Sequence, residues 1–300
     1  MNNSLNRGLL TTVAAVFFLS SCSESWDLIN LVEHPQDFFQ ALGEHNTNII
    51  TKLSVGGSHL CSLSAQGQAR CEGSNLYKQL ELPTEYSYSD ISAGGLHTCA
   101  LTTNNKLVCV GENAAGQAPQ DFDEPLSHIS AGAFHSCAIS TSGRVICFGS
   151  NMYNQSIPPE GHDFVAISSG GFHSCALRES GLVQCFGDDS HGQSSPPAGI
   201  LFSSISAGFD HTCGISIDKK LVCFGASSQE RLGSSDEQFS SVSAGGFHTC
   251  ALNVNNQVRC FGRTLASGVP ENHHWLLISS GMQKSCGLKS DGQISCFESS

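Results

Sequence analysis

The chain has 300 residues, enough for one large domain or two small ones. Its formal charge of −12 disfavours binding to nucleic acid or to anionic lipid, because both interactions need clustered Lys and Arg side chains. The 31 glycines and 9 prolines suggest many turns, and the 15 cysteines require either bound metal or an oxidising compartment.

The N-terminal segment predicts export and lipidation. A single charge, Arg7, precedes an apolar run over 9–19, which is too short to span a bilayer and fits the core of a signal peptide. The run ends in Leu-Ser-Ser followed by Cys22, which resembles the lipobox of bacterial lipoproteins, whose cysteine is lipidated and becomes the new N-terminus. Ordinary signal cleavage after a small residue is the alternative.

These features divide the chain into three parts. We expect a lipoprotein signal peptide over 1–21, a lipid anchor and spacer over 22–50, and the body of the protein over 51–300. Several acyl chains on Cys22 would give stable anchoring. By resemblance to bacterial lipoproteins, Ser23 in place of Asp favours the outer membrane, on its periplasmic or its cell-surface side.

A motif of the form I-S-A-G-G-F-H-T-C-A-L recurs seven times in the body. Its cysteines follow one another at intervals of 38, 38, 38, 38, 37 and 36 residues, and each has a second cysteine ten residues further on. Fourteen cysteines are thereby accounted for, and Cys22 is the fifteenth. The predicted disulfides are Cys61–Cys71, Cys99–Cys109, Cys137–Cys147, Cys175–Cys185, Cys213–Cys223, Cys250–Cys260 and Cys286–Cys296.

The third repeat shows why this pairing is local. Its pattern predicts three short strands, over 129–131, 135–140 and 144–148. A three-residue turn joins the last two strands as a hairpin. Pairing across this turn places Cys137 directly opposite Cys147, where Cβ atoms about 4.5–5.5 Å apart can be bridged.

Zinc is the competing use of these cysteines, because His-x-Cys followed by a second Cys offers three ligands. Structural zinc usually needs four ligands, often from closely spaced CxxC pairs, so we expect disulfides and no metal. The histidine of the motif recurs in six repeats, and Lys284 takes its place in the seventh. Six equivalent copies are not six active sites, so we expect hydrogen bonds between neighbouring repeats from His59, His97, His135, His173, His211 and His248.

These residues resemble the regulator of chromosome condensation repeat. The match comprises the A-G-G-x-H-T-x-A-L strand, the G-x-V-x-C-F-G strand and a G-x-N-x-x-G-Q segment, which reads Gly111-Glu-Asn-Ala-Ala-Gly-Gln117 here. It covers about residues 50–300 and implies an all-β fold, a seven-bladed β-propeller. The period of 38 residues leaves room for three to four short strands per blade, and the cysteine pairs add one disulfide to each blade. The short period is closer to that of the propeller-type β-lactamase inhibitor proteins than to that of the nuclear exchange factor. The cysteine pairs are an addition to the family pattern, and Phe replaces the usual strand Trp at positions 148, 186, 224, 261 and 297.

Positions that vary within the constant repeat frame are the best guide to function. The fourth residue after each F-G glycine is such a position, and the repeat places these residues in neighbouring loops on one rim. Exposed aromatic side chains are typical interface anchors, although tyrosines can also pack between blades. The predicted binding residues in the inter-repeat loops are Tyr77, Tyr86, Tyr88, Met152, Tyr153, Asp189 and His191.

We therefore expect a non-enzymatic binding or scaffold propeller on the cell envelope that recognises a protein partner. No cofactor, metal or nucleic acid is expected, the lipid anchor is the only expected membrane contact, and a monomer is the expected state. One alternative is an enzyme inhibitor resembling the propeller β-lactamase inhibitor. The other is a propeller enzyme acting on polysaccharide, which would need paired carboxylates at the channel mouth. No motif predicts catalytic residues, and the sequence leaves open the partner, the binding face and the closure of the ring.

Overall fold

The computed structural model describes residues 49–120, 122–226, 236–262 and 273–298, all within a compact unit that spans Asn48–Ser300. The predicted signal peptide, the lipidation site Cys22 and nearly all of the predicted spacer lie outside the described residues. All regular elements of the described residues are β-strands. None of the residues that the structure describes belongs to a helix with the length and hydropathy needed to cross a bilayer.

The described strands form seven antiparallel sheets, each with three strands in chain order. The first three sheets contain β1 (Ile50–Val55), β2 (His59–Ser64) and β3 (Ala69–Gly73); β4 (Tyr88–Ala93), β5 (His97–Thr102) and β6 (Leu107–Gly111); and β7 (Leu126–Ala131), β8 (His135–Ser140) and β9 (Val145–Gly149). The next two contain β10 (Phe164–Ser169), β11 (His173–Arg178) and β12 (Val183–Gly187); and β13 (Phe202–Ala207), β14 (His211–Ser216) and β15 (Leu221–Gly225). The last two contain β16 (Phe239–Ala244), β17 (His248–Asn253) and β18 (Val258–Gly262); and β19 (Trp275–Ser280), β20 (Lys284–Lys289) and β21 (Ile294–Glu298).

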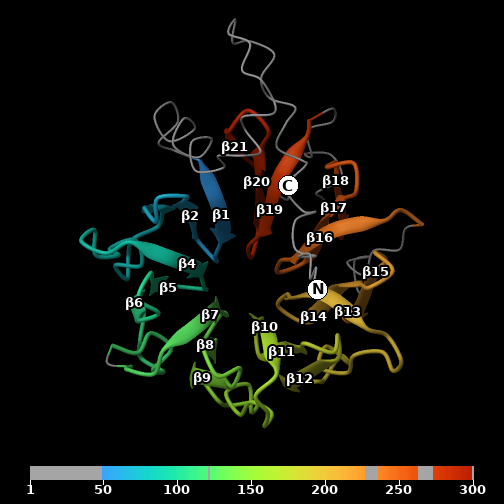
Figure 1. Cartoon of the computed structure of the whole chain (residues 1–300), viewed down its shortest axis with the longest axis horizontal. Helices are drawn as coiled ribbons and strands as arrows, with labels where there is room; N and C mark the ends of the chain where they lie inside the picture. Colours follow the sequence, from blue (N-terminus) through green and yellow to red (C-terminus); the bar gives the residue numbers. More distant parts are fainter. Residues whose placement is uncertain (1–48, 121, 227–235, 263–272, 299–300) are drawn as a thin grey trace, which may run out of the picture. The chain divides into compact units, whose positions relative to one another are not determined.

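The seven sheets are the blades of a ring, shown in Figure 1. The first strand of each sheet lies innermost and packs against the first strands of the preceding and following sheets, and β1 packs against β19. The prediction of an all-β, seven-bladed propeller is confirmed. Each described blade has three strands, the lower of the two numbers expected.

Within each blade, the cysteines join the middle and outer strands. In the third blade Cys137 lies opposite Cys147 and Ile139 opposite Val145, as the predicted register required. Gly143 closes the hairpin with φ +80°. All seven predicted disulfides are present, with Cα atoms 4.0–4.1 Å apart. Disulfides in this number are typical of proteins exported to an oxidising compartment.

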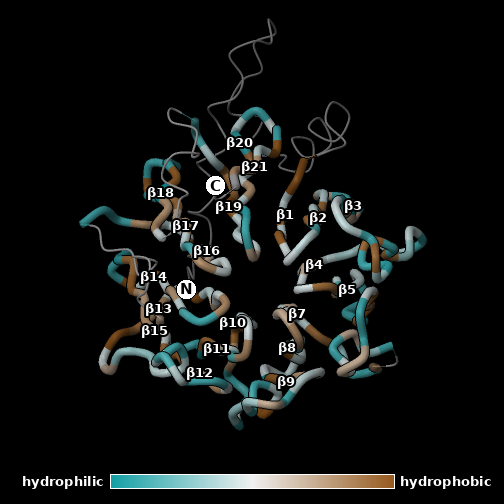
Figure 2. The backbone as a smooth tube through the Cα atoms, turned by 180° about the vertical axis from the view of Figure 1, so that it is seen from behind, coloured by the Kyte–Doolittle hydropathy of each residue, from teal (hydrophilic) through white to brown (hydrophobic). Residues whose placement is uncertain are grey.

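The hydrophobic core is divided among the spaces between blades. In one cluster Ile215 and Leu221 of the fifth blade pack with Phe239 of the sixth. Figure 2 shows hydrophobic segments within the blades, while many peripheral connections are hydrophilic. The first residue of the inner strand fills this space in six blades, where it is buried: Tyr88, Leu126, Phe164, Phe202, Phe239 and Trp275.

Two closed rings of hydrogen bonds link the blades around the central channel. In the first, the amide that follows each inner-turn glycine donates to the glycine carbonyl of the next blade, over 3.0–3.1 Å at six junctions and 3.4 Å from Met282 to Gly56. In the second, an inner-strand serine accepts from a backbone amide of the next blade at all seven junctions, for example Ser130 from Ser169.

The glycines of the first ring are required by the close approach of neighbouring blades. A Cβ atom on Gly170 would lie 2.2 Å from the carbonyl oxygen of Gly208, and the other six junctions are comparably tight, at 2.2–2.6 Å. A side chain there would force the blades apart. The recurrent glycine of the motif therefore sets the width of the channel.

Candidate functional site

Two sets of connections define the two faces of the propeller. On one face lie the turns between inner and middle strands and the loops that cross from one blade to the next. On the other face lie the hairpins between middle and outer strands. We call the described loops 74–79, 112–117, 150–155 and 188–193 the crossing loops, their side the crossing-loop face, and the opposite side the hairpin face.

Each crossing loop is held at its start by its own blade. The first amide of the loop donates to the carbonyl of the inner turn, as Ser150 does to Phe134 over 3.0 Å and Asp188 to Phe172 over 2.9 Å. The end of the loop contacts the next blade, where the Thr98 hydroxyl donates to the carbonyl of Gln79 over 2.7 Å. The loop therefore has a fixed position at both ends.

Side-chain amides and carboxylates fix the interior of each crossing loop. The buried side chain of Gln155 accepts from the amide of Tyr153 over 2.8 Å, and its equivalents hold residues 77, 115 and 191 in the same way. The Asn151 side chain accepts from the Ser156 amide over 3.1 Å, and Asp189 makes the same contact in the next loop. The variable position is thus carried on a constant, rigid frame.

The motif histidines form a third set of links between blades, as the sequence predicted. Six Nε2 atoms lie 2.7–2.8 Å from a Ser or Thr hydroxyl of the next blade. Because the Thr98 hydroxyl donates to Gln79, it accepts from His59, so Nε2 of His59 carries the proton. The histidine, the hydroxyl and the crossing-loop carbonyl therefore form one chain of hydrogen bonds.

Burial keeps these imidazoles neutral. It lowers the pKa of His97 and of His173 to about 3, and that of His135 to about 4, with smaller contributions from neighbouring histidines to the first two. The Nδ1 atoms of all three have no hydrogen-bond partner among the described residues, so a second proton would have no acceptor. These contacts give the motif histidines a structural role between neighbouring blades.

Five of the seven predicted rim residues lie on the crossing loops. Tyr77 and Tyr153 are 47% and 46% exposed on the crossing loops, next to the far more exposed Leu76 and Met152. Asp189 and His191 are exposed on the fourth crossing loop. These residues lie on one face, as expected from the repeat. The equivalent positions 229 and 266 lie outside the described residues.

The other two predicted tyrosines lie elsewhere. Tyr88 is 3% exposed at the start of β4, and its hydroxyl donates to the carbonyl of Pro83 over 2.7 Å, so it belongs to the core and not to a binding surface. Tyr86 is exposed at a lateral pocket of about 570 Å³ beside the second blade, which Glu85 and Lys106 also line. It is therefore separate from the crossing-loop residues.

An aromatic row, which the sequence analysis missed, adjoins the crossing loops. Ring centroids lie 5.3 Å apart for Phe134 and Phe172, 5.3 Å for Phe172 and Phe209, and 6.4 Å for Phe209 and Phe247. Tyr153 joins the row with its ring 5.2 Å from that of Phe172. Three of these phenylalanines precede the motif histidine, and that recurrence within the frame was the available signal.

Acidic side chains of the fourth crossing loop serve as hydrogen-bond acceptors. The carboxylate of Asp188 accepts from Ser190 and Gln193, and that of Asp189 accepts from the Ser194 amide and the Ser195 hydroxyl. These contacts shape the loop.

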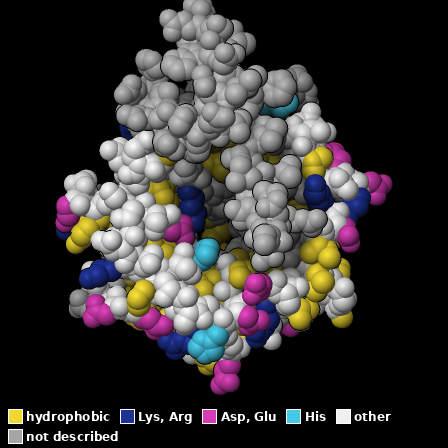
Figure 3. Space-filling view, in the orientation of Figure 1, with side chains coloured by type: hydrophobic (Ala, Val, Ile, Leu, Met, Phe, Trp, Pro, Cys, Tyr) yellow, Lys and Arg dark blue, Asp and Glu magenta, His cyan; other side chains and the backbone are white. Residues whose placement is uncertain are grey.

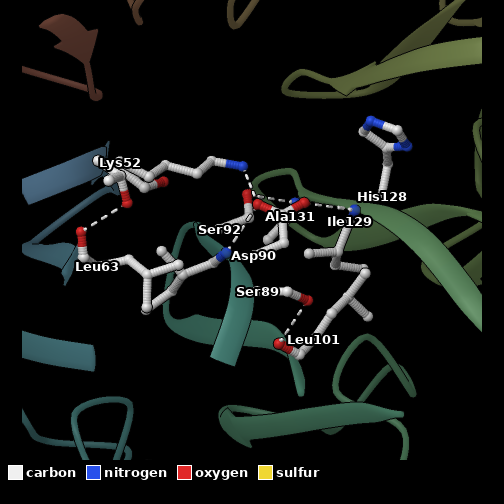
Figure 4. Close-up of polar contacts among 12 residues, drawn as sticks. Lys52, Leu63, Ser89, Asp90, Ser92, Leu101, His128, Ile129 and Ala131 are labelled. Carbon is white, nitrogen blue, oxygen red and sulfur yellow. Dashed lines mark hydrogen bonds and ion pairs between the residues drawn. The ribbon is translucent and has the colours of Figure 1, made fainter. Parts of the chain in front are cut away.

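Charged side chains also link the inner strands of the first three blades. Lys52 forms an ion pair with Asp90, whose other oxygen accepts from the Ile129 amide over 3.2 Å, and His128 stands at the equivalent place on β7 (Figure 4). Figure 3 shows a basic, an acidic and a histidine side chain at the margin of the central hollow on one face. The bonding partners of Asp90 indicate a link between blades.

No cluster of three potential metal ligands occurs in the described part of the chain.

The fold and these repeats define the class of protein, a disulfide-linked propeller built from tandem repeats. The model of the regulator of chromosome condensation (RCC1) repeat matches residues 88–117, 127–155, 164–193, 202–230 and 239–264. The chain is therefore an RCC1-type repeat protein. A search of curated protein sequences finds no match to it.

Solved structures support the same fold. The ectodomain of the receptor kinase CR4 from Physcomitrella patens is 28% identical, covers 82% of this chain and 72% of its own, and superposes with a TM-score of 0.71. The ectodomain of the Arabidopsis thaliana receptor kinase ACR4 is 23% identical over 83% of this chain and 95% of its own, also at 0.71. Prp20p of Saccharomyces cerevisiae, described with its binding to Gsp1p and histones, is 16% identical over 84% of this chain and 83% of its own, at 0.69.

Proposed function

We propose that this chain is a non-enzymatic binding propeller that recognises a protein partner through its crossing-loop face. The observation that carries the proposal is the display of Tyr77 and Tyr153, two half-exposed tyrosines, on loops whose backbone is fixed by buried glutamines. A rigid frame that presents variable aromatic side chains loses little conformational entropy on binding. Among its structural neighbours, yeast Prp20 has been crystallised bound to Kap60, which adds support for a protein partner.

We further propose that the protein is exported and held at the outer membrane of a bacterial cell through lipid on Cys22, with residues 1–21 removed and the rest of 22–50 acting as a spacer. The disulfides support export to an oxidising compartment, and the lipobox-like sequence supports the anchor. Replacing Cys22 with serine should move the protein from the membrane fraction to the soluble fraction of lysed cells. Continued recovery in the membrane fraction would contradict the anchor.

A pull-down after cross-linking on intact cells tests recognition by the crossing-loop face. The test variant combines Tyr77→Ala, Tyr153→Ala and His191→Ala. The control variant combines Leu182→Ala, Ile217→Ala and Val254→Ala, which remove apolar side chains, each 45–58% exposed, from hairpins on the opposite face. Both variants are first shown to melt at the wild-type temperature with intact disulfides.

The proposal predicts that wild type and control capture the same partner, and that the test variant loses it. If the control loses the partner and the test variant keeps it, the hairpin face is the binding face. If no form captures a partner, recognition of a protein is contradicted. A captured enzyme whose activity falls on binding would identify the chain as an inhibitor.

A further inference from the structure

The aromatic row is not a requirement of the fold. The residue before the motif histidine is Phe in three blades of the row, but Ser58 in the first blade and Leu96 in the second; in the fifth blade Phe209 stands one residue earlier, before Asp210. Those two blades have the same strands and the same register as the others. Large aromatic side chains at this position therefore need another explanation.

The row is also open to solvent. Phe134 and Phe247, at its two ends, are 43% and 42% exposed, and Phe172 and Phe209 between them are partly exposed. Phe209 reaches across to the neighbouring blade, where its ring would lie 2.8 Å from a Cβ atom on Gly171. The four rings thus form a continuous apolar strip across four consecutive blades beside the channel mouth.

Carboxylates adjoin this strip, and the described loops that carry it contain no Lys or Arg. Asp188 is bonded through its amide to the carbonyl of Phe172, Asp189 is exposed next to it, and Asp210 directly follows Phe209. The hydrogen bonds that the carboxylates of Asp188 and Asp189 accept come from neutral serine and glutamine groups. The loops without Lys or Arg are 132–134, 150–155, 170–172, 188–193, 208–210 and 245–247.

We propose that the aromatic row and Asp188, Asp189 and Asp210 together bind a peptide segment of the partner that carries arginine and apolar side chains. Guanidinium groups stack on aromatic faces and pair with carboxylates in two parallel hydrogen bonds, so both parts of the site suit the same residue. Apolar side chains of the segment cover the remaining ring surface. The inference deepens the proposed function and rests on it.

Charge complementarity selects this occupant. A second copy of the chain would bring the same aspartates face to face, and an anionic lipid surface would be repelled by them. The net charge of −12 also attracts a basic partner at longer range. A basic segment is the ligand that both the local and the overall charge favour.

A direct binding experiment with defined peptides tests the proposal. The purified residues 23–300 with intact disulfides are titrated by fluorescence polarisation with a labelled octapeptide of alternating Arg and Leu. Two companion peptides replace Arg with Glu, or Leu with Ser. We expect saturable binding of the Arg–Leu peptide, weaker binding of the Arg–Ser peptide, and none of the Glu–Leu peptide. Raising NaCl from about 0.05 to about 0.5 M should weaken binding, because salt screens exposed charges.

Two variants with matched controls locate the site. Phe172→Ala should weaken binding of the Arg–Leu peptide by about five-fold or more, as loss of a stacked cation contact implies, while Ile217→Ala on the hairpin face leaves it unchanged. Asp189→Asn should weaken it by about two- to five-fold, while Asp218→Asn leaves it unchanged. Asparagine is the natural residue at this place in three other crossing loops, where Asn75, Asn113 and Asn151 accept the same loop-closing hydrogen bond. The Asp189 variant therefore changes charge and keeps the loop.

The proposal is overturned if the Arg–Leu peptide fails to bind, if the Glu–Leu peptide binds equally well, or if Phe172→Ala and Ile217→Ala behave alike. Any of these results together with a partner captured through Tyr77 and Tyr153 would leave the proposed function intact and reject only the basic segment. Failure of the pull-down is a separate result that rejects the proposed function itself.

Discussion

Single hydrogen-bonded histidines connect the blades to the loops that display the candidate site. His59 donates from Nε2 to Thr98, and Thr98 donates to the carbonyl of Gln79, whose side chain holds the amide of Tyr77. The imidazole and the hydroxyl are buried, and the other two groups are a backbone carbonyl and a backbone amide. Removing one side chain of this chain of hydrogen bonds therefore leaves a polar atom of its neighbour without a hydrogen bond. Ring packing and loop display therefore depend on the same few side chains.

Stability should fall on mild acidification. Burial lowers the pKa of His59, His135 and His248 to about 4, and that of His97 and His173 to about 3, from an ordinary value of 6.5. Between about pH 4 and pH 6.5 the unfolded chain binds protons that the folded chain does not, so the free energy of unfolding decreases as the pH falls. Melting followed by calorimetry from pH 7 to pH 5 should show a falling midpoint, and the slope should be shallower for His135→Gln. A midpoint that is constant or rises on acidification would contradict neutral histidines.

Removing one hydroxyl of this network should destabilise the fold. Ser136→Ala leaves Nε2–H of His97 without its acceptor, at a loss of about 1–3 kcal/mol in the free energy of unfolding. Ser180→Ala, at an exposed hairpin position, should change it by less than about 0.5 kcal/mol. Denaturant unfolding under oxidising conditions compares the two variants, and equal losses would show that the buried hydroxyl has no special role.

At the scale of the blade, the sequence predicted the hairpin and its disulfide because strand pairing has a fixed period. Cysteines ten residues apart around a three-residue turn fall opposite each other, and left-handed turn residues such as Gly143 or Asn105 end the preceding strand. The sequence could also have predicted that Tyr88 lies in the core. It occupies the place of Leu126 and Trp275 at the start of the inner strand, an apolar position in every later repeat.

The aromatic row could not be predicted from one repeat at a time. Phe134 and Phe172 are 38 residues apart, and only the closing of the ring brings their side chains within stacking distance. Tyr153 joins them because its loop crosses to the next blade, a path that no local pattern specifies. Contacts between blades depend on the radius and stagger of the ring, which the sequence of a single blade does not encode.

One blade should tolerate the loss of its disulfide with a limited loss of stability. The double variant Cys137→Ala, Cys147→Ala opens a loop closed over 10 residues, and chain entropy sets an upper limit of about 3 kcal/mol. The hairpin turn already keeps these strands together, so the loss should fall below that limit. Calorimetry of the double variant at neutral pH measures it, and an unchanged or raised melting temperature would contradict a stabilising bridge.

At the scale of the molecule, the ring closes between the last blade and the first without an exchanged strand among the described residues. The junction keeps the serine link, in which the Val55 amide donates to the Ser279 hydroxyl, but its glycine link, from the Met282 amide to the Gly56 carbonyl, measures 3.4 Å. The histidine link has no counterpart there, because Lys284 replaces the histidine and Leu60 replaces the hydroxyl residue. The last junction therefore has the fewest hydrogen bonds of the three kinds.

This junction should open most readily. The Met282 amide is expected to exchange its hydrogen faster than the Gly171 and Gly246 amides. Those two amides make the equivalent bond over 3.0 Å at other junctions of the ring. Native-state hydrogen exchange followed by mass spectrometry or NMR compares the three sites. Equal protection would show that the ring has no preferred point of opening.

Site-specific photo-cross-linking on intact cells tests the central claim, recognition of a protein by the crossing-loop face, most directly. A photoreactive phenylalanine is placed at Tyr153 in one protein and at Ile217, on the hairpin face, in another; the two positions are 46% and 58% exposed. The account predicts one specific cross-linked protein from position 153, out-competed by an excess of wild-type propeller, and none from position 217. A specific product from position 217 alone, or no competable product from either position, would contradict it.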